Sequence, residues 1–211
     1  MRRADEVSGP KVVITLSVRR SDFSERLRGM MRLLSRSERA SLCLVAGNPS
    51  YLTEEERRRS AGELLHSAAE LVIRELGSDA EVFVGTEKVE RTVERLCAEH
   101  NVVPFLLLDD HSPELLARFR PNGNRLAVYV PFAVSTRRDE AVSSLLPYVE
   151  RRMRALGLSG DPSEHVDRFC VVGTQDEVSS RLRALSGRYD VVIGYPAFPD
   201  QAQLRFWAGL R

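Results

Sequence analysis

Three features of the sequence predict a parallel α/β fold. Runs of apolar and mostly β-branched residues alternate with stretches of helical periodicity. Runs that are apolar at nearly every position are typical of strands covered on both faces of a sheet. No hairpin turn joins one run to the next, so consecutive strands should pair in parallel through helical crossovers. The chain should therefore form either a barrel of alternating strands and helices or a doubly wound sheet.

The first half of the chain contains four of the predicted strands. Thr53 and Glu56 have the spacing of a capping box, which marks the start of a long helix. Pro104 is expected at the start of its strand or at an edge, because proline has no amide hydrogen for the sheet. The predicted strands are 12–18, 41–46, 81–84 and 102–108, and the predicted helices are 23–34, 53–76 and 89–99.

Two further strands and several helices follow in the second half. Ser112-Pro113 and Asp161-Pro162 are cap and first-turn signatures, and Thr174 with Glu177 forms another capping box. The predicted strands are 125–134 and 190–194, and helices are expected at 112–119, at 139–156, after Asp161 and after Thr174. The total is about six strands.

Composition predicts one folded domain over residues 1–211. The formal net charge is +1, with acids and bases spread along the chain, so no basic field is available to attract nucleic acid. No apolar run approaches the roughly 18 residues of a membrane span, and the first residues lack the apolar core of a signal peptide. We therefore expect a cytoplasmic protein with neither a nucleic-acid nor a membrane partner.

The cysteines and histidines show no metal-binding pattern. Cys43, Cys97 and Cys170 each lie in an apolar stretch without C-x-x-C spacing, which predicts buried free thiols. The four histidines lack ligand spacing, so no metal site is expected. His111 follows the strand at 102–108, where the alternatives are a place at an active-site rim and a solvated loop residue.

Several segments, in order and spacing, resemble the bacterial luciferase-like superfamily. The tail carries the clearest likeness, and its most specific piece is Val-Gly-Thr-x-x-Glu-Val at 172–178. The other matching segments are Leu44–Leu52, Val82–Thr86, Leu126–Val134 and Leu146-Pro147-Tyr148. The superfamily includes deazaflavin (coenzyme F420)-dependent oxidoreductases, among them archaeal-type proteins like methylene-tetrahydromethanopterin reductase.

This resemblance implies a TIM-barrel-like fold that is incomplete relative to eight strands. The likeness runs from about Lys11 to the last strand, while the family's first two strands have no counterpart. The chain therefore looks like an N-terminally shortened member. A barrel without two strands would expose sheet edges that recruit partners, so a homo-oligomer such as a homodimer is expected.

The resemblance also indicates which residues would contact a cofactor, since ligands of such barrels lie over the carboxyl ends of the strands. Three strand ends carry candidates. The candidate cofactor-binding residues are Ser17, Val18, Arg19, Gly47, Asn48, Gly85, Thr86 and Lys88. No catalytic residue can be assigned.

Each candidate group also has an ordinary structural explanation. The bond between Ser17 and Val18 could be the family's cis peptide or an ordinary trans bond, and Arg19 with Arg20 could bind an anion or remain solvated. Gly47-Asn48 could approach a ligand or form a tight turn that needs glycine. The segment 85–88 could hold a phosphate at a helix start or simply begin that helix.

Two functions from different classes remain. The first is a shortened or degenerate oxidoreductase that binds coenzyme F420 or flavin mononucleotide (FMN) and transfers hydride to a pterin-like small molecule. The second is a non-catalytic paralogue without a cofactor that acts as a homo-oligomeric binding or interaction module. Tight chromophore binding favours the first function, and its absence together with an extensive dimer interface favours the second.

Overall fold

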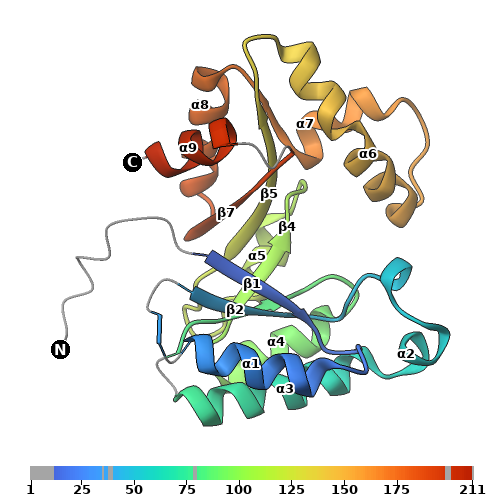
Figure 1. Ribbon diagram of the computed structural model, residues 1–211, viewed down its shortest axis with the longest axis vertical. Coiled ribbons are helices and arrows are strands. Elements are labelled where there is room, and N and C mark those ends of the chain that lie inside the picture. The colour runs from blue at the N-terminus through green and yellow to red at the C-terminus, as the bar shows by residue number, and fades with distance from the viewer. Residues whose placement is uncertain (1–11, 35, 38–39, 78–79, 198–200, 211) are drawn as a thin grey trace. The chain divides into compact units, whose positions relative to one another are not determined.

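The computed structural model describes residues 12–34, 36–37, 40–77, 80–197 and 201–210 (Figure 1). Contacts divide the chain into two compact units. Unit 1 comprises residues 1–106 and 113–126, and unit 2 comprises residues 107–112 and 127–211. The N-terminal residues on which the signal-peptide prediction rests lie outside the described residues.

Unit 1 is built on parallel strands that follow one another in chain order. These are β1 (Val12–Ser17), β2 (Ala40–Val45), β3 (Val82–Gly85) and β4 (Val103–Leu107), the last residue of which belongs to unit 2. Ser17 is in register with Val45, and Gly85 with Phe105. Because the strands are parallel, their carboxyl ends emerge at one edge of the sheet.

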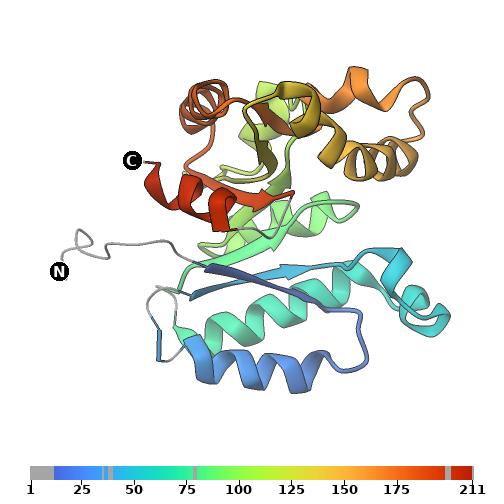
Figure 2. The same cartoon turned by 45° about the horizontal axis from the view of Figure 1, so that its top comes forward.

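Along the chain, the helices of unit 1 alternate with these strands, as the periodicity predicts. Figure 2 shows α1 and α3 side by side along β1 and β2. The elements are α1 (Phe23–Leu34), the 3₁₀ turn η1 (Pro49–Tyr51), α2 (Glu54–Arg58), α3 (Ala61–Leu76), α4 (Glu90–Glu99) and α5 (Pro113–Arg118).

The prediction of a single helix over 53–76 is wrong in the middle of that range. The capping box of Thr53 and Glu56 is present, but Arg59 and Ser60 are extended and separate α2 from α3. The Ser60 side chain accepts a hydrogen bond from the Glu63 amide at 3.5 Å and so begins a second helix. Serine competes with helical backbone bonding in this way, which favours a cap over a helix interior.

The first strand is less covered than its apolar sequence suggests. β2 and β3 are buried over most of their lengths, whereas within β1 only Leu16 is buried and Val12 is 57% exposed. The prediction of burial on both faces is therefore wrong for β1. In unit 1, β1 is an edge strand that pairs with β2 on one side. An edge strand has fewer neighbours to cover its faces.

Unit 2 is built around β5 (Ala127–Val134). This strand pairs in parallel with both β6 (Val171–Gly173) and β7 (Val191–Pro196). The helices are α6 (Arg138–Leu156), α7 (Val166–Phe169), α8 (Gln175–Ser186) and α9 (Gln201–Gly209), with the 3₁₀ turn η2 (Pro162–His165) before α7.

Helices cover both faces of β5. Ala133 packs into an apolar cluster with α6 and α7 that includes Val149 and Phe169. The neighbouring residue Phe132 points to the opposite face, where its ring stacks on Trp207 of α9 at a centroid distance of 4.9 Å. This alternation is the period of two that a strand imposes on its side chains.

The predicted fold class, a parallel α/β TIM-barrel-like fold that is incomplete relative to eight strands, is confirmed. The described residues form seven strands rather than about six. The sequence did not predict β6, because its three residues are shorter than the runs taken as strands, and it did not predict α9.

Cys43, Cys97 and Cys170 are buried free thiols, as predicted. None of the helices in the described part of the chain is long and apolar enough to cross a membrane.

Candidate functional site

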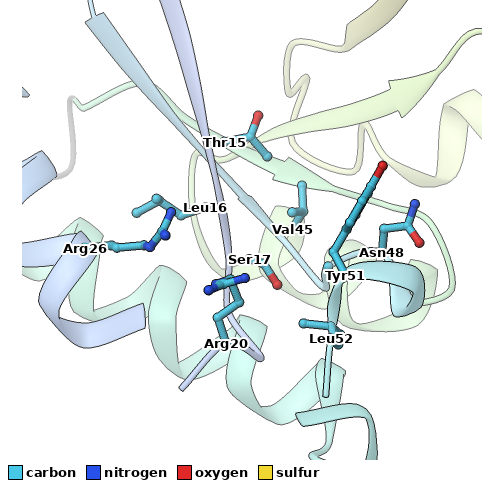
Figure 3. A pocket seen from close by; sticks show the side chains of 10 residues that line it. Thr15, Leu16, Ser17, Arg20, Arg26, Val45, Asn48, Tyr51 and Leu52 are labelled. Atoms are coloured by element: carbon cyan, nitrogen blue, oxygen red, sulfur yellow. The ribbon is translucent and has the colours of Figure 1, made fainter. Parts of the chain in front are cut away.

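A cavity of about 290 Å³ lies at the carboxyl ends of β1 and β2 in unit 1 (Figure 3). Ser17 and Val45 are the last residues of these two strands. The residues that line the cavity are Thr15, Leu16, Ser17, Arg20, Arg26, Val45, Gly47, Asn48, Tyr51 and Leu52. Three of the predicted cofactor-binding residues, Ser17, Gly47 and Asn48, are therefore brought together.

Gly47 allows the two strand ends to approach each other. Its φ of +92° is a conformation that other residues rarely adopt. A Cβ added at Gly47 would collide with Oγ of Ser17, and the Ser17 hydroxyl donates to the Ala46 carbonyl at 3.5 Å. Gly47 therefore forms the tight turn that needs glycine, and it also lines the cavity.

The turn after Gly47 holds an exposed aromatic ring beside the cavity. Oδ1 of Asn48 accepts from the Ser50 amide at 2.9 Å, and the Tyr51 amide donates to the Asn48 carbonyl at 3.0 Å. Nε of Arg57 donates to the carbonyls of Pro49 and Leu52. The backbone is thus fixed while the Tyr51 side chain remains 73% exposed (Figure 3).

Arg19 holds the same turn rather than facing the cavity. Its Nε donates to the Ala46 carbonyl and its Nη2 to the Gly47 carbonyl, both at 2.8 Å. Nη1 of Arg59 donates in turn to the Arg19 carbonyl at 2.9 Å. The guanidinium of this half-buried residue is thus bonded to backbone carbonyls, an arrangement that neither sequence alternative for Arg19 described.

Arg20 and Arg26 form the charged wall of the cavity, and the carboxylate of Asp22 lies between them. Asp22 accepts from Nε of Arg20 at 2.8 Å and from Nε of Arg26 at 2.7 Å. The hydrogen bonds from Arg20 and Arg26 lower the pKa of Asp22 to about 2. Of these three charged residues, only Arg20 and Arg26 line the cavity, so its lining side chains are cationic.

Glu56 fixes the loop between β1 and α1. Oε1 of this buried carboxylate accepts from both the amide and the hydroxyl of Ser21, at 2.7 and 3.0 Å, and Oε2 accepts from the Thr53 amide. The hydrogen bond from the Ser21 amide, followed by that from the Thr53 amide, lowers the pKa of Glu56 to about 2. The capping-box spacing signalled the bond to Thr53, but nothing local signalled the bonds to Ser21.

Val18 and Gly85 support the cavity wall without lining it. Val18 is buried, its amide donates to the Val45 carbonyl at 2.9 Å, and the peptide bond between Ser17 and Val18 is trans. A Cβ on Gly85 would lie 2.8 Å from Cγ1 of Val45. Gly85 therefore allows β3 to pack closely against β2.

Thr86 and Lys88 lie outside the cavity, in the segment before α4. The amide and hydroxyl of Thr86 both donate to the Phe105 carbonyl, at 3.1 and 3.4 Å. Lys88 has a φ of +62°, and its amide donates to Oε1 of Glu90 at 3.2 Å. Because a carboxylate of the chain already accepts from this amide, the contacts favour a helix start over a phosphate cradle.

His111, in unit 2, belongs to a half-buried polar cluster after β4. Its Nδ1 lies 2.9 Å from the Tyr189 hydroxyl, and burial lowers its pKa. The neighbouring Asp109 accepts from Nε of Arg168 at 2.6 Å, and Nη2 of Arg152 lies 3.7 Å away. Of the two alternatives for His111, these contacts disfavour the solvated loop residue. In the described ranges, no group of three or more His, Cys, Asp or Glu side chains could hold a metal ion.

The residues around the cavity fit one end of a flavin-type cofactor. Leu16, Val45 and Leu52 offer apolar walls for a planar ring, and the Gly47 backbone lies open to it without a side chain. The volume of 290 Å³ is at the lower limit of the roughly 300–1,000 Å³ usual for ligand pockets. The cavity could therefore admit a ring system but not a whole dinucleotide-sized molecule.

A family model described as "Family of unknown function (DUF7388)" matches residues 4–203. An uncharacterised protein of Methanocaldococcus jannaschii, MJ1239, is 28% identical over 205 residues, which are 97% of this chain and 77% of that protein.

Solved structures of low sequence identity share the fold. Apo-MsnO8 aligns with a TM-score of 0.61 at 15% identity, covering 94% of this chain and 75% of its own. An F420-dependent secondary alcohol dehydrogenase in complex with an F420-acetone adduct aligns at 0.57 and 9% identity, over 84% and 70%. The coenzyme F420-dependent tetrahydromethanopterin reductase from Methanopyrus kandleri aligns at 0.57 and 12% identity, over 82% and 73%. The superfamily resemblance seen in the sequence is thus supported at the level of the fold.

Proposed function

This chain belongs to the family of unknown function DUF7388, and we propose that it is an oxidoreductase that binds a flavin or deazaflavin and transfers hydride to a pterin-like molecule. One observation carries the proposal. The cavity opens at the carboxyl ends of parallel strands, beside a glycine whose backbone faces it. Ligands of parallel α/β barrels bind at this end of the strands. Two proteins of similar fold are F420-dependent by their names.

The cavity residues have separate tasks in this proposal. Leu16, Val45 and Leu52 exclude water from one face of the ring, and Tyr51 stacks against its accessible part. Arg20 and Arg26 give the wall its net positive charge, which favours the anionic form of the ring or an acidic substituent. The bound cofactor would supply the hydride, while the chain's residues orient the cofactor and shield its ring from water.

Titration of the purified protein with FMN and, separately, with coenzyme F420 tests the proposal through changes in cofactor fluorescence. Saturable binding of one cofactor is expected. Gly47→Ala should weaken it by about tenfold or more, a loss that needs only about 1.4 kcal/mol, because the new Cβ collides with Ser17. Tyr51→Ala should weaken it by about two- to twelvefold, the value of one aromatic contact.

Gly77→Ala is the matched control. Gly77 ends α3 with a φ of +89°, close to that of Gly47, but open space surrounds the position of its Cβ. Both alanines should destabilise the fold by about 1–3 kcal/mol through backbone strain, and only Gly47→Ala should affect binding. If neither cofactor binds the wild-type protein, or if both alanines weaken binding equally, the proposed site is wrong.

Exposed apolar side chains favour a second candidate function, a homo-oligomeric interaction module. Val12 on β1 is 57% exposed and Leu33 on α1 is 45% exposed, both in unit 1. Light scattering during size-exclusion chromatography tests this candidate. A dimer that Val12→Asp converts to a folded monomer supports it, and a wild-type monomer at all concentrations contradicts it.

A further inference from the structure

We infer that unit 2 contains a second ligand site, a groove between α8 and α9 that takes a small aromatic anion such as an aromatic carboxylate or sulfonate. The groove has a volume of about 890 Å³, within the range usual for small-molecule pockets. The elements around it, α8, β7 and α9, lie together in Figure 1. Its residues all belong to unit 2 and differ from those of the cavity in unit 1.

The floor of the groove is apolar and aromatic. It is formed by Leu182 of α8, Val192 of β7, and Phe206 and Trp207 of α9. Leu182 is buried, whereas Val192 and the two aromatic residues are only partly covered. Partly covered rings on a fixed support can stack against a planar ligand at little entropic cost.

Contacts with β5 and β7 hold α9 in place, so the groove is not a gap beneath a loosely attached helix. The buried Gln203 side chain accepts from the Val134 amide at 2.9 Å and donates to the Val134 carbonyl at 2.7 Å. Trp207 stacks on Phe132 with an interplanar angle of 29°. Gly194 makes room for this stacking, because a Cβ there would collide with the indole ring.

Two arginines give the groove its preference for an anion. Arg183 of α8 and Arg205 of α9 line it from opposite helices, together with one acid, Asp176. Arg205 donates to Oε1 of Gln201, and among the described residues neither guanidinium has a carboxylate partner. The lining therefore carries a net charge of +1 beside an aromatic floor, which matches a ligand with one planar ring system and one negative charge.

The groove and the proposed cofactor cavity are made of different residues. The groove follows α8 from Gln175, just after the carboxyl end of β6, to Ser186, and it also includes Val192 of β7. The cavity is lined by residues of unit 1 alone. A ligand in the groove would therefore occupy a site separate from the proposed cofactor cavity.

The chain's single tryptophan makes the groove directly measurable, because its fluorescence comes from Trp207. The test is a titration of the full chain with 1-anilinonaphthalene-8-sulfonate, an aromatic anion, followed by quenching of Trp207. The uncharged N-phenyl-1-naphthylamine serves as the comparison ligand. We expect saturable one-to-one quenching by the sulfonate, weaker binding of the neutral compound, and lower affinity in added salt.

Variants connect the signal to the groove. Arg183→Gln and Arg205→Gln should each weaken sulfonate binding by about two- to fivefold, as expected for one exposed charge. Arg154→Gln, in the exposed last turn of α6, removes the same charge from unit 2 outside the groove and should leave binding unchanged. Near-ultraviolet circular dichroism of Trp207 confirms that each variant keeps its tertiary packing.

Three outcomes would overturn the inference. They are the absence of saturable quenching, equal binding of the charged and neutral compounds, and equal effects of all three arginine substitutions. Sulfonate binding that decreases as protein concentration rises would also overturn it, because a second copy of the chain would then occupy the groove.

Discussion

Arginine side chains hold the loops around the unit 1 cavity by bonding to backbone carbonyl groups. Arg19 bonds to Ala46 and Gly47, and Arg57 bonds to Pro49 and Leu52. A guanidinium has five donors in a rigid plane, so one side chain can satisfy several carbonyls at once. Lysine at these positions would keep the charge and lose this geometry.

Protonation of Glu56 should make the stability of the folded protein fall measurably at acidic pH. Its pKa lies near 2, below the ordinary 4.5, so the ionised carboxylate stabilises the folded state above about pH 4.5. That contribution is lost as the pH falls toward 2. Glu56→Gln, which can no longer accept on both side-chain atoms, should lower the melting temperature at pH 7 and flatten its decline between pH 4.5 and 2.

Thermal melts at several pH values check this prediction. Asp22 titrates over the same range, so part of the slope should remain in Glu56→Gln. An unchanged slope in the variant would show that the bonds to Ser21 and Thr53 do not depend on ionisation of Glu56.

At the scale of elements, local sequence patterns predicted most helices and strands. They did not predict where a capping side chain interrupts a helix. The expected helix over 53–76 is divided because Ser60 caps α3. Pro104, in contrast, is accommodated as the second residue of β4, in register with Val84. Glycines within helices also differ in whether a neighbouring side chain leaves room for a Cβ atom.

Gly29 in α1 predicts a stabilising substitution. No atom lies within 4 Å of the position of its Cβ, and it lies inside the helix. Gly29→Ala should raise the free energy of unfolding by about 0.5–1 kcal/mol, because alanine loses less backbone entropy than glycine in a helix. Gly62→Ala in α3 is the comparison, since its Cβ would lie 2.7 Å from Oγ1 of Thr92. Denaturant unfolding should show a gain for Gly29→Ala and a smaller gain or a loss for Gly62→Ala.

For the whole molecule, the buried cysteines divide between the two compact units. Cys43 and Cys97 belong to unit 1, and Cys170 belongs to unit 2. Burial raises the pKa of Cys97 and Cys170 to about 12 and raises that of Cys43 as well. Since the thiolate is the reactive form, the thiols should be nearly inert in the folded protein.

Thiol labelling tests the prediction of a single domain. A single cooperative domain should expose its three cysteines over the same range of denaturant concentration. Labelling with a thiol reagent at pH 8, followed by peptide mass spectrometry, would show the denaturant concentration at which each cysteine becomes accessible. Labelling of all three thiols in the fully unfolded protein is the reference. Modification of Cys170 at a clearly lower concentration than the other two would show that unit 2 unfolds separately.

The sequence by itself determined the parallel α/β class, both capping boxes, the burial of the cysteines and the strand ends that carry Ser17 and Gly47. These features depend on periodicity and on residues a few positions apart, which sequence displays directly. Only the tertiary structure decided that Arg19 bonds to Ala46, that Glu56 holds Ser21, and that Tyr51 lies beside the cavity. Such contacts join residues up to several tens of positions apart, and a side chain's partner across that separation is set by chain packing.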